Sequence, residues 1–331
     1  MDHLHIRTEA SAEIGFGHAM RCLAIAEAAR ARDIGVTFLM AALHPALALR
    51  LAGIGAEWRP TDAAIGTQED AAALDDLVPR GAALLVDSYA VDVAYLAALH
   101  TRFLLVLMDD LAQLPALPCS VLVNASAGAP ALPYEALAPG AVKLLGAGYA
   151  PIRREFAEPA TPVVPGPSVA VMFGGSDVRH YTPAVCRSLL AALPDRIVKA
   201  IVGPAAKGRE VLETLAGVEP RLRLFVNPPR VADVLAGSGL VVTAAGGSVG
   251  EIAAMGLMAL VVVVADNQVS AFESCPYPVL DGRRVLPPDL GALAAGYVAD
   301  AARSGTLAAR AQALVDGRGS ARIIERLCTL V

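Results

Sequence analysis

Apolar, strand-like segments alternate with Ala- and Leu-rich helical segments along almost the whole chain, and this alternation limits the possible folds most strongly. It is typical of parallel sheets covered by helices on both faces. The sequence therefore predicts an α/β protein with Rossmann-like sheets. The expected strands are Leu4–Thr8, Val36–Met40, Ala83–Val86, Phe103–Met108, Val121–Val123, Ser168–Phe173, Val198–Val202, Leu222–Val226, Leu240–Thr243 and Met258–Val264.

The chain is expected to form two domains, because 331 residues are many for a single core. Pro159–Pro167 is rich in proline and can continue neither a helix nor a central strand, so we interpret it as a linker. The predicted domains are residues 1–158 and 168–312. Residues 313–331 are expected to include a final helix, from about Arg322 to Leu327, that packs back on the first domain.

The composition excludes several classes of protein. A hydrophobic content of 55% with 18% charged residues indicates a packed globular protein. A net charge of -5 argues against nucleic acid as a partner. The longest apolar run, Leu257–Ala265, is much shorter than the roughly 20 residues of a membrane-spanning helix. Polar residues near the N-terminus stand where an export signal would be apolar.

Five scattered cysteines, without a Cys-x-x-Cys pair, fit a reduced cytoplasmic protein and argue against a zinc site. We accordingly expect no metal, no cofactor and no membrane insertion. The oligomeric state stays open, with a monomer slightly favoured.

A first glycine motif, Gly15-Phe16-Gly17-His18, joins the first predicted strand to a helix. Such a turn lets the backbone approach a ligand and directs N–H groups at it. His18 would lie in the first helical turn, where the helix dipole favours a neutral imidazole that can act as a general base. A purely structural histidine is the alternative. Met20 stands where the dinucleotide fingerprint has its third glycine, so that motif is absent.

Two further glycine turns follow strands in the second half, Gly174-Gly175-Ser176-Asp177 and Gly246-Gly247-Ser248. Their backbone N–H groups could hold a diphosphate at a helix N-terminus. Ordinary helix caps are the alternatives: Ser176 or Asp177 as an N-cap, and Ser248 with Glu251 as a capping box. No Gly-Lys-Ser/Thr sequence follows the glycines, so neither turn is a Walker motif.

Polar residues follow several predicted strands, at the edge where doubly wound sheets bind ligands. Each of these residues could equally cap a helix or shape a turn. Arg21, one turn after His18, could contact a sugar or phosphate, or it could be an exposed helix residue. The polar strand ends are Asp87-Ser88-Tyr89, Asp109-Asp110, Asn124 and Asp266-Asn267-Gln268.

The opening Ile6–Ser11 and Ile14–Leu23 resembles that of the nucleotide-sugar hydrolases of pseudaminic acid biosynthesis, and Phe173–Asp177 is similar to that family's Phe-Gly-Gly-Ser-Asp. The family's usual reaction splits UDP-2,4-diacetamido-2,4,6-trideoxy-β-L-altropyranose into UDP and the free sugar. The resemblance implies a GT-B-type fold, like that of the UDP-GlcNAc transferase of peptidoglycan synthesis, with two Rossmann-like domains facing a cleft. It weakens between Ala271 and Gly305, where Cys275–Pro278 and Pro287-Pro288 interrupt the helix that the family places there.

What the resemblance implies for the site is a metal-independent hydrolase in which His18 is catalytic and Glu251 binds the ribose. The sequence alone leaves two alternatives open, a glycosyltransferase that uses a UDP-sugar donor and a non-catalytic nucleotide-sugar binding protein. The implied nucleotide-binding residues are Gly174, Gly175, Ser176, Gly246, Gly247, Ser248 and Glu251. The implied substrate-binding residues are Gly15, Gly17, Arg21, Asp87, Tyr89, Asn267 and Gln268.

Overall fold

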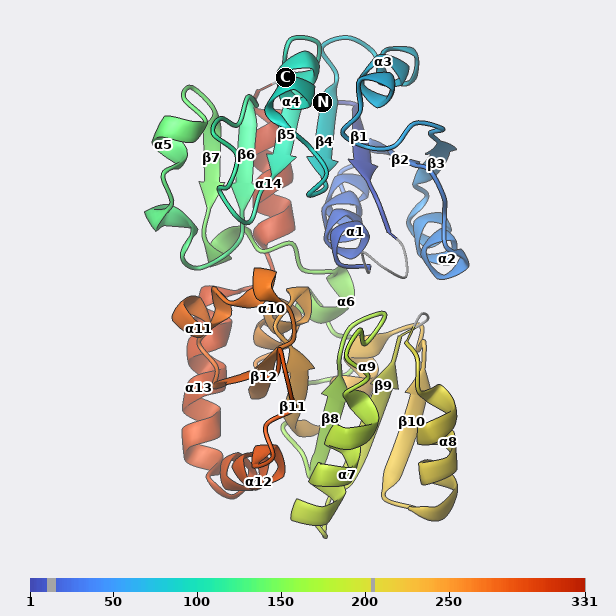
Figure 1. Cartoon of the computed structure of the whole chain (residues 1–331), viewed down its shortest axis with the longest axis vertical. Coiled ribbons are helices and arrows are strands. Elements are labelled where there is room, and N and C mark those ends of the chain that lie inside the picture. Colours follow the sequence, from blue (N-terminus) through green and yellow to red (C-terminus); the bar gives the residue numbers. More distant parts are fainter. Residues whose placement is uncertain (11–15, 204–205, 331) are drawn as a thin grey trace. The chain divides into compact units, whose positions relative to one another are not determined.

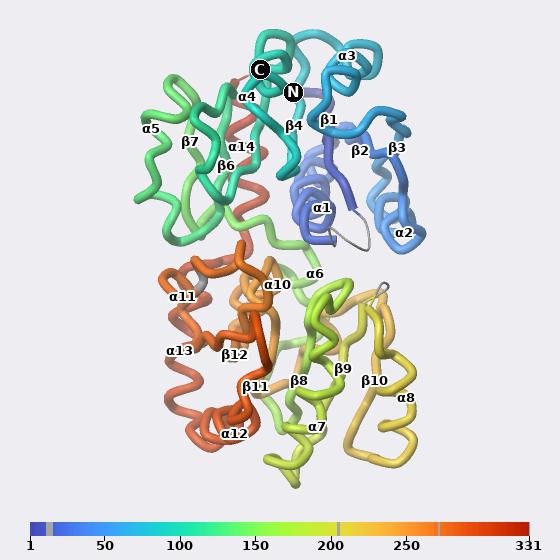
Figure 2. The backbone as a smooth tube through the Cα atoms, viewed as in Figure 1, coloured from blue at the N-terminus to red at the C-terminus, as the bar shows by residue number. Residues whose placement is uncertain are grey.

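The chain forms two compact units in the computed structural model, which describes residues 1–10, 16–203 and 206–330 (Figure 1). Unit 1 consists of Met1–Arg153 together with Arg318–Val331, and unit 2 consists of Arg154–Gly317. Both chain ends therefore belong to unit 1 (Figure 2).

Unit 1 is built on a seven-stranded sheet in the order β3-β2-β1-β4-β5-β6-β7, and every neighbouring pair is parallel. The strands are β1 (His3–Thr8), β2 (Gly35–Met40), β3 (Glu57–Pro60), β4 (Ala83–Asp87), β5 (Leu104–Met108), β6 (Val121–Asn124) and β7 (Val142–Leu145). The helices are α1 (Gly17–Arg30), α2 (Pro45–Ile54), α3 (Gln68–Leu77), α4 (Val93–His100), α5 (Tyr134–Leu137) and α14 (Gly319–Cys328), with 3-10 turns η1 (Ala129–Ala131) and η2 (Ala147–Tyr149).

The inner strands β2, β1, β4, β5 and β6 of the unit 1 sheet are buried on both faces, and they are rich in apolar residues for that reason. Ala83 and Leu85 of β4 pack into a core with α1, α2 and α14, whereas Leu84 and Val86 belong to a second core with α3 and α4. Alternate residues of one strand thus contact helices on opposite sides, as the two-residue period of a strand requires. This is a doubly wound sheet.

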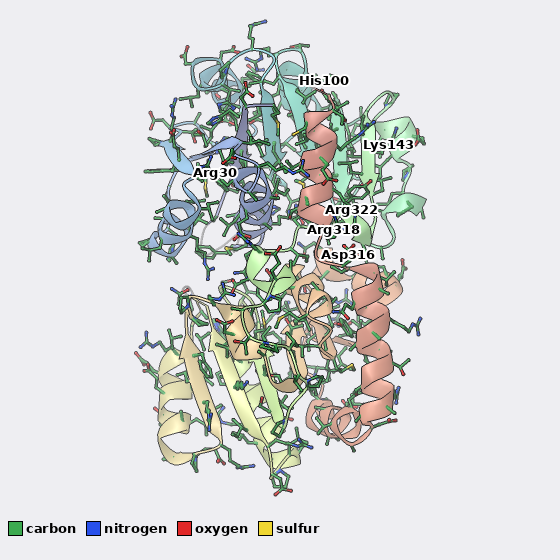
Figure 3. All side chains as sticks on the ribbon, turned by 180° about the vertical axis from the view of Figure 1, so that it is seen from behind. Arg30, His100, Lys143, Asp316, Arg318 and Arg322 are labelled. Carbon is green, nitrogen blue, oxygen red and sulfur yellow. The ribbon has the colours of Figure 1, made fainter. Side chains whose placement is uncertain are left out.

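The C-terminal helix α14 belongs to the first of these cores and packs against α1 (Figure 3). Ile323, Ile324 and Leu327 are fully buried on its inner face. At its start a Cβ on Gly319 would lie 2.2 Å from the carbonyl oxygen of Ala150, so this close approach requires glycine. The last helix of the chain, α14, therefore packs in the same core as the first strand, β1.

Unit 2 repeats the plan with a six-stranded parallel sheet in the order β10-β9-β8-β11-β12-β13. Its strands are β8 (Ser168–Met172), β9 (Ile197–Val202), β10 (Leu222–Val226), β11 (Ser238–Ala244), β12 (Ala259–Val263) and β13 (Val279–Asp281). Its helices are α6 (Arg154–Ala157), α7 (Thr182–Ala192), α8 (Arg209–Val218), α9 (Val231–Leu235), α10 (Gly247–Ala254), α11 (Ala271–Ser274), α12 (Leu290–Ala299) and α13 (Ala301–Leu314), with the 3-10 turn η3 (Asp266–Gln268).

Three strands were not expected from the sequence. All four residues of β3 are exposed, so this edge strand has no apolar signal. β7 alternates weakly and β13 has only three residues, between Pro278 and Gly282. In the segment after Asn267, where the prolines were expected to interrupt a helix, the chain forms the short α11, β13 and then α12.

The division between the units also differs in detail from the predicted linker. It falls between Arg153 and Arg154, and the proline-rich segment that follows belongs to unit 2. Pro167 forms an antiparallel bridge with Ser238, and Gly166 approaches the backbone of Gly237. The proline-rich segment Pro159–Pro167 therefore belongs to unit 2 and does not form a linker between the two units. None of the helices in the described residues has the length and apolar composition needed to cross a membrane.

His5 on β1 makes the stability of unit 1 depend on pH. The ring is buried, its Nδ1 has no hydrogen-bond partner among the described residues, and the ring of His3 lies 4.6 Å away. Burial, followed by the charge of His3, lowers the pKa of His5 from 6.5 to about 4. Between pH 6.5 and about pH 4, His5 therefore binds a proton in the unfolded chain but not in the folded chain.

We expect unit 1 to lose about 2 kcal/mol of unfolding free energy between pH 7 and pH 5 because of His5. Stability falls as the pH is lowered because the native state favours the neutral ring. The measurement is urea denaturation followed by the fluorescence of Trp58, the only tryptophan in the sequence and a residue of β3 in unit 1. His5→Leu serves as the comparison: an unchanged pH dependence in this variant would contradict the assignment.

Candidate functional site

Each unit has one topological switch point, where neighbouring strands continue to helices on opposite faces of the sheet. In unit 1 it lies between β1 and β4, and in unit 2 between β8 and β11. The loops that follow these four strands contain most of the residues that the sequence singled out. Ligands of doubly wound sheets bind at the carboxyl ends of such strands, so these loops define one candidate site in each unit.

In unit 1, the central residue is His18, which is buried in the first turn of α1. Its Nδ1 lies 2.6 Å from Oδ1 of Asp87, the last residue of β4. An ionised carboxylate only accepts hydrogen bonds, so Nδ1 is the donor and the neutral ring has its lone pair on Nε2. Nε2 has no hydrogen-bond partner within the described part of the chain. The basic nitrogen of the oriented imidazole can therefore accept a proton.

Asp87 is completely buried and is kept ionised by Arg21. The guanidinium donates from Nε to Oδ2 and from Nη2 to Oδ1, both at 2.6 Å. Burial by itself would raise the pKa of Asp87, but the charge of Arg21 and the hydrogen bonds from Arg21 and His18 hold it well below its usual range. Asp87, which accepts the hydrogen bond from Nδ1 of His18, is thus an ionised carboxylate throughout the neutral pH range.

Asp110, which follows β5, completes this network. Both of its carboxylate oxygens accept from Nη1 of Arg21, at 2.9 and 2.8 Å. The same carboxylate accepts a hydrogen bond of 2.7 Å from the hydroxyl of Tyr89, whose ring stands edge-on to His18 with 4.6 Å between the centroids. Burial and the neighbouring Asp110 raise the pKa of Tyr89, so its hydroxyl stays protonated. Asp110 therefore holds two neighbours of His18 in place.

Two of the simpler interpretations are wrong for this network. Asp87 and Asp110 do not act as helix caps, and the side chain of Arg21 is only 22% exposed, so it is not a free surface arginine. Asp109 does have the local role that was considered for it, because it accepts from the backbone N–H of Ala112 and from the hydroxyl of Tyr134. Asp109 and Asp110 both follow β5, so strand order does not separate them. The difference lies in their side-chain partners, since only Asp110 contacts Arg21 and Tyr89.

The first glycine motif is described only in part. Gly15 lies outside the described residues. Gly17 is the first residue of α1, and a Cβ at that position would meet no atom within 4 Å. The backbone beside His18 is therefore open on the side that a side chain would otherwise fill.

In unit 2, the loop after β8 contains Gly174, Gly175 and Ser176. Gly174 has a φ of +75°, which favours glycine. The carboxylate of Asp177 accepts from the backbone N–H groups of Tyr181 and Thr182 at the start of α7. Asp177 therefore stabilises the start of this helix, but the N-cap residue is Tyr181, so Asp177 is not the ordinary N-cap that the alternative proposed. Ser176 does not have this role.

The loop after β11 leads directly into α10. Gly246 is its N-cap, which provides no side chain for a cap, and Gly247 is its first residue. Val249 N–H already donates to the carbonyl oxygen of Gly246, so Ser248 lies inside the helix and cannot head a capping box. The first backbone N–H groups of a helix have no partner within it, and a Cβ at Gly246 or Gly247 would meet nothing within 4 Å. Glu251 is buried one turn further along.

Asn267 and Gln268 lie in η3, after β12. The Oε1 atom of Gln268 accepts from the backbone N–H of Val264 at 2.9 Å, so this side chain stabilises the turn itself. The structure thus brings His18, Arg21, Asp87 and Tyr89 together in unit 1, and places the two glycine loops at one switch point in unit 2. Among the described residues, no cluster of three or more His, Cys, Asp and Glu side chains is arranged to hold a metal ion.

No protein-family model matches the sequence, and no curated protein matches it. Solved structures do match over the whole chain. MurG of Acinetobacter baumannii aligns with a TM-score of 0.64 at 15% identity, covering 99% of this chain and 100% of that one. Staphylococcus aureus MnaA, in a co-structure with UDP, aligns with a TM-score of 0.69 at 15% identity over 100% and 98%. Anabaena Alr3699/HepE, in complex with UDP-glucose, aligns with a TM-score of 0.62 at 13% identity over 99% and 100%.

These likenesses, together with the two parallel sheets, show the fold. The chain has the two-domain, Rossmann-like GT-B architecture of MurG-like proteins, as the sequence predicted.

Proposed function

We propose that this protein is a UDP-sugar hydrolase that releases UDP and the free sugar. The observation that carries the proposal is the orientation of His18, whose Nδ1 is held by Asp87 at 2.6 Å while Nε2 is uncommitted among the described residues. A neutral imidazole oriented by a buried carboxylate is a general base. Structures of the same fold in complex with UDP and UDP-glucose support a UDP-sugar as the ligand.

In the proposed reaction, Nε2 of His18 removes a proton from a water molecule as its oxygen attacks the anomeric carbon. A carbon–oxygen bond forms, and the bond between that carbon and the diphosphate breaks with its electron pair leaving on UDP. Asp87 accepts a hydrogen bond from Nδ1 throughout and stabilises the imidazolium that forms. Arg21 keeps Asp87 ionised, and Asp110 keeps Arg21 and Tyr89 in place.

The nucleotide is assigned to unit 2. The N–H groups at the start of α10 and the loop Gly174–Ser176 would bind the diphosphate and stabilise the charge that grows on it as it leaves. Glu251 would accept hydrogen bonds from the ribose hydroxyls. Asn267 and Gln268 would lie on the sugar side. No step of this mechanism uses a metal ion.

The specific substrate that we propose is UDP-linked diacetamido-trideoxy-altrose, because of the resemblance of the opening and of Phe173–Asp177 to the hydrolases that cleave it. The test is ¹H NMR of this compound with the purified protein over time, with and without EDTA. Free sugar and UDP that appear at the same rate in both samples would support the metal-independent hydrolase. Substrate that stays intact while its resonances broaden would contradict hydrolysis, and would favour a glycosyltransferase that needs an acceptor or a binding protein.

Glu251→Gln is expected to weaken UDP binding more than it changes the melting temperature. Gln cannot accept from both ribose hydroxyls as a carboxylate does, and charge-assisted hydrogen bonds are roughly twice as strong as neutral ones. Calorimetric titration with UDP and thermal unfolding measure the two quantities. Since Gly246 caps α10, no capping box is at stake. A lower melting temperature with unchanged UDP affinity would overturn the ribose assignment.

A further inference from the structure

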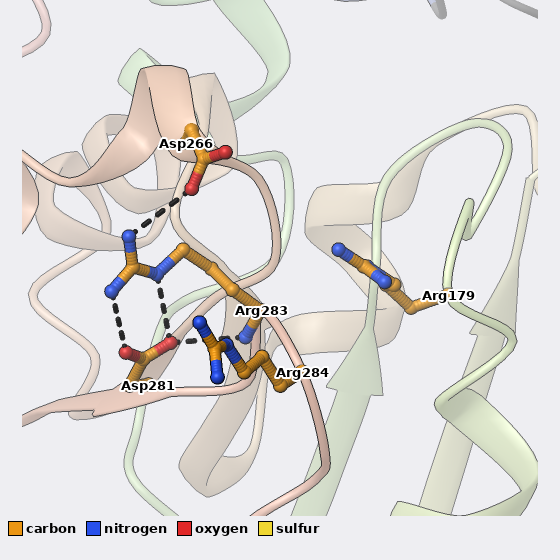
Figure 4. Close-up of a pocket in the computed structure, with 5 residues that line it drawn as sticks. All are labelled: Arg179, Asp266, Asp281, Arg283 and Arg284. Carbon is orange, nitrogen blue, oxygen red and sulfur yellow. Dashed lines mark hydrogen bonds and ion pairs between the residues drawn. The ribbon is translucent and has the colours of Figure 1, made fainter.

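A polar cavity lies at the carboxyl-end edge of the unit 2 sheet, and the proposed mechanism does not use it. It has a volume of about 320 Å³. Figure 4 shows Arg179 on one side and two arginines with two aspartates on the other. The cavity, called the arginine pocket below, is lined by Arg179, Asp266, Asp281, Arg283 and Arg284. The loop after β8, the turn η3 and the end of β13 contribute to it, so residues about a hundred positions apart in the chain meet here.

Arg283 forms ion pairs with both carboxylates of the pocket. Its Nη1 pairs with Asp266 at 3.1 Å, and its Nη2 and Nε donate to the two oxygens of Asp281 at 2.7 and 3.0 Å. These hydrogen bonds, more than any other effect, lower the pKa of Asp281 to about 2. All the donor groups of the Arg283 fork are directed at carboxylates, so this arginine connects β13 to η3, and its one positive charge offsets one of the two negative charges.

Arg179 and Arg284 retain donors for a ligand. The Nε of Arg179 donates to the carbonyl oxygen of Val264 at 3.0 Å, which fixes the side chain, but its two terminal nitrogens have no hydrogen-bond partner in the described part of the chain. Arg284 makes no hydrogen bond or ion pair with any described residue. Three guanidinium groups face two carboxylates, so the pocket has one positive charge in excess and two planar sets of N–H donors.

The backbone of Val264 links the pocket to the turn η3, which is assigned to the sugar side of the proposed site. Val264 is the common anchor, because its carbonyl accepts from Arg179 while its N–H donates to Gln268. Arg179 follows the loop Gly174–Asp177 by two residues. Arg283 and Arg284 come from the segment in which the sequence departs from the hydrolases that it resembles elsewhere. This chain therefore adds cationic groups of its own beside the sugar side of the proposed site.

We propose that the arginine pocket binds an anionic oxygen group, a carboxylate or a phosphate, through Arg179 and Arg284. Planar guanidinium groups match the paired oxygens of both anions. The anion has two possible sources, an acidic substituent on the sugar of a UDP-sugar or a free anion that binds beside it. The first source would require a sugar other than diacetamido-trideoxy-altrose, which has no acidic group. Only the first source rests on the proposed UDP-sugar function.

The experiment compares the wild-type protein with the double variant Arg179→Gln/Arg284→Gln and with Arg310→Gln. The control removes one positive charge from an exposed position on α13, elsewhere in unit 2. UDP-glucose and UDP-glucuronate are titrated by calorimetry, and inorganic phosphate by ³¹P NMR, at constant ionic strength. Their affinities separate a carboxylate on the sugar from a free anion.

If the anion belongs to the sugar, the wild type binds UDP-glucuronate more tightly than UDP-glucose, and the double variant loses roughly tenfold in affinity for UDP-glucuronate alone. If the anion is free, phosphate binds to the wild type and to Arg310→Gln, and the double variant loses that binding. If the wild type and the double variant bind all three probes with the same affinities, the proposal that the pocket binds an anion is wrong. Absence of binding by either UDP-sugar, with phosphate binding that depends on the two arginines, would refute the proposed function and leave the pocket standing.

Discussion

His18→Asn is expected to lower the turnover of the UDP-sugar roughly 10²- to 10⁴-fold, the range typical of a lost general base. The side-chain amide of Asn can still donate to Asp87, which now receives 2.6 Å hydrogen bonds from His18 and Arg21. What the variant lacks is a second nitrogen that can take a proton from water. UDP affinity is expected to stay the same, because the loops proposed to bind the nucleotide belong to unit 2. Steady-state kinetics and UDP titration measure both quantities.

The matched control is His100→Asn. His100 ends α4 at the amino-terminal edge of the unit 1 sheet, the edge opposite the one that contains His18 (Figure 3). The same chemical change at this exposed position should leave turnover unchanged. Activity that survives in His18→Asn would show that this histidine is structural, and the proposed mechanism would then be wrong.

Arg21→Leu is expected to lower the unfolding free energy of unit 1 by about 3 kcal/mol. The variant leaves the carboxylate of Asp87, which is fully buried, without the guanidinium that compensates its charge. Removing one partner of a buried ion pair leaves an uncompensated charge, and the cost comes chiefly from that charge rather than from the lost attraction. Urea denaturation followed by Trp58 fluorescence reports on unit 1.

The double variant Arg21→Leu/Asp87→Asn shows whether the lost stability comes from the uncompensated charge of Asp87 or from the lost packing of the Arg21 side chain. It removes both members of the pair, so it should be more stable than Arg21→Leu alone, even though it carries one more substitution. Asp110 keeps the hydroxyl of Tyr89 as a donor in both variants. A loss below about 1 kcal/mol in the single variant, in the range of a surface pair, would mean that solvent reaches Asp87 and that the network does not orient His18.

The sequence by itself determined the parallel α/β class, most of the strands of both sheets and the glycine turns that follow them. Strands buried on both faces are runs of apolar residues, and turns between a strand and a helix need glycine, so both signals are contained in short stretches of the chain. The predicted Leu222–Val226 coincides with β10, and most other strands differ by one or two residues at an end. The exposed edge strand β3 was missed because it buries no apolar face.

The tertiary structure decided which polar residues meet. Arg21, Asp87 and Asp110 come from three separate elements, and nothing local to any of them shows that they form one network rather than caps or a surface arginine. Strand order β1-β4-β5 brings their ends together. The arginine pocket likewise depends on β13 lying next to β12. Backbone patterns are encoded within one element, whereas a constellation of side chains depends on which strand ends become neighbours in the folded sheet.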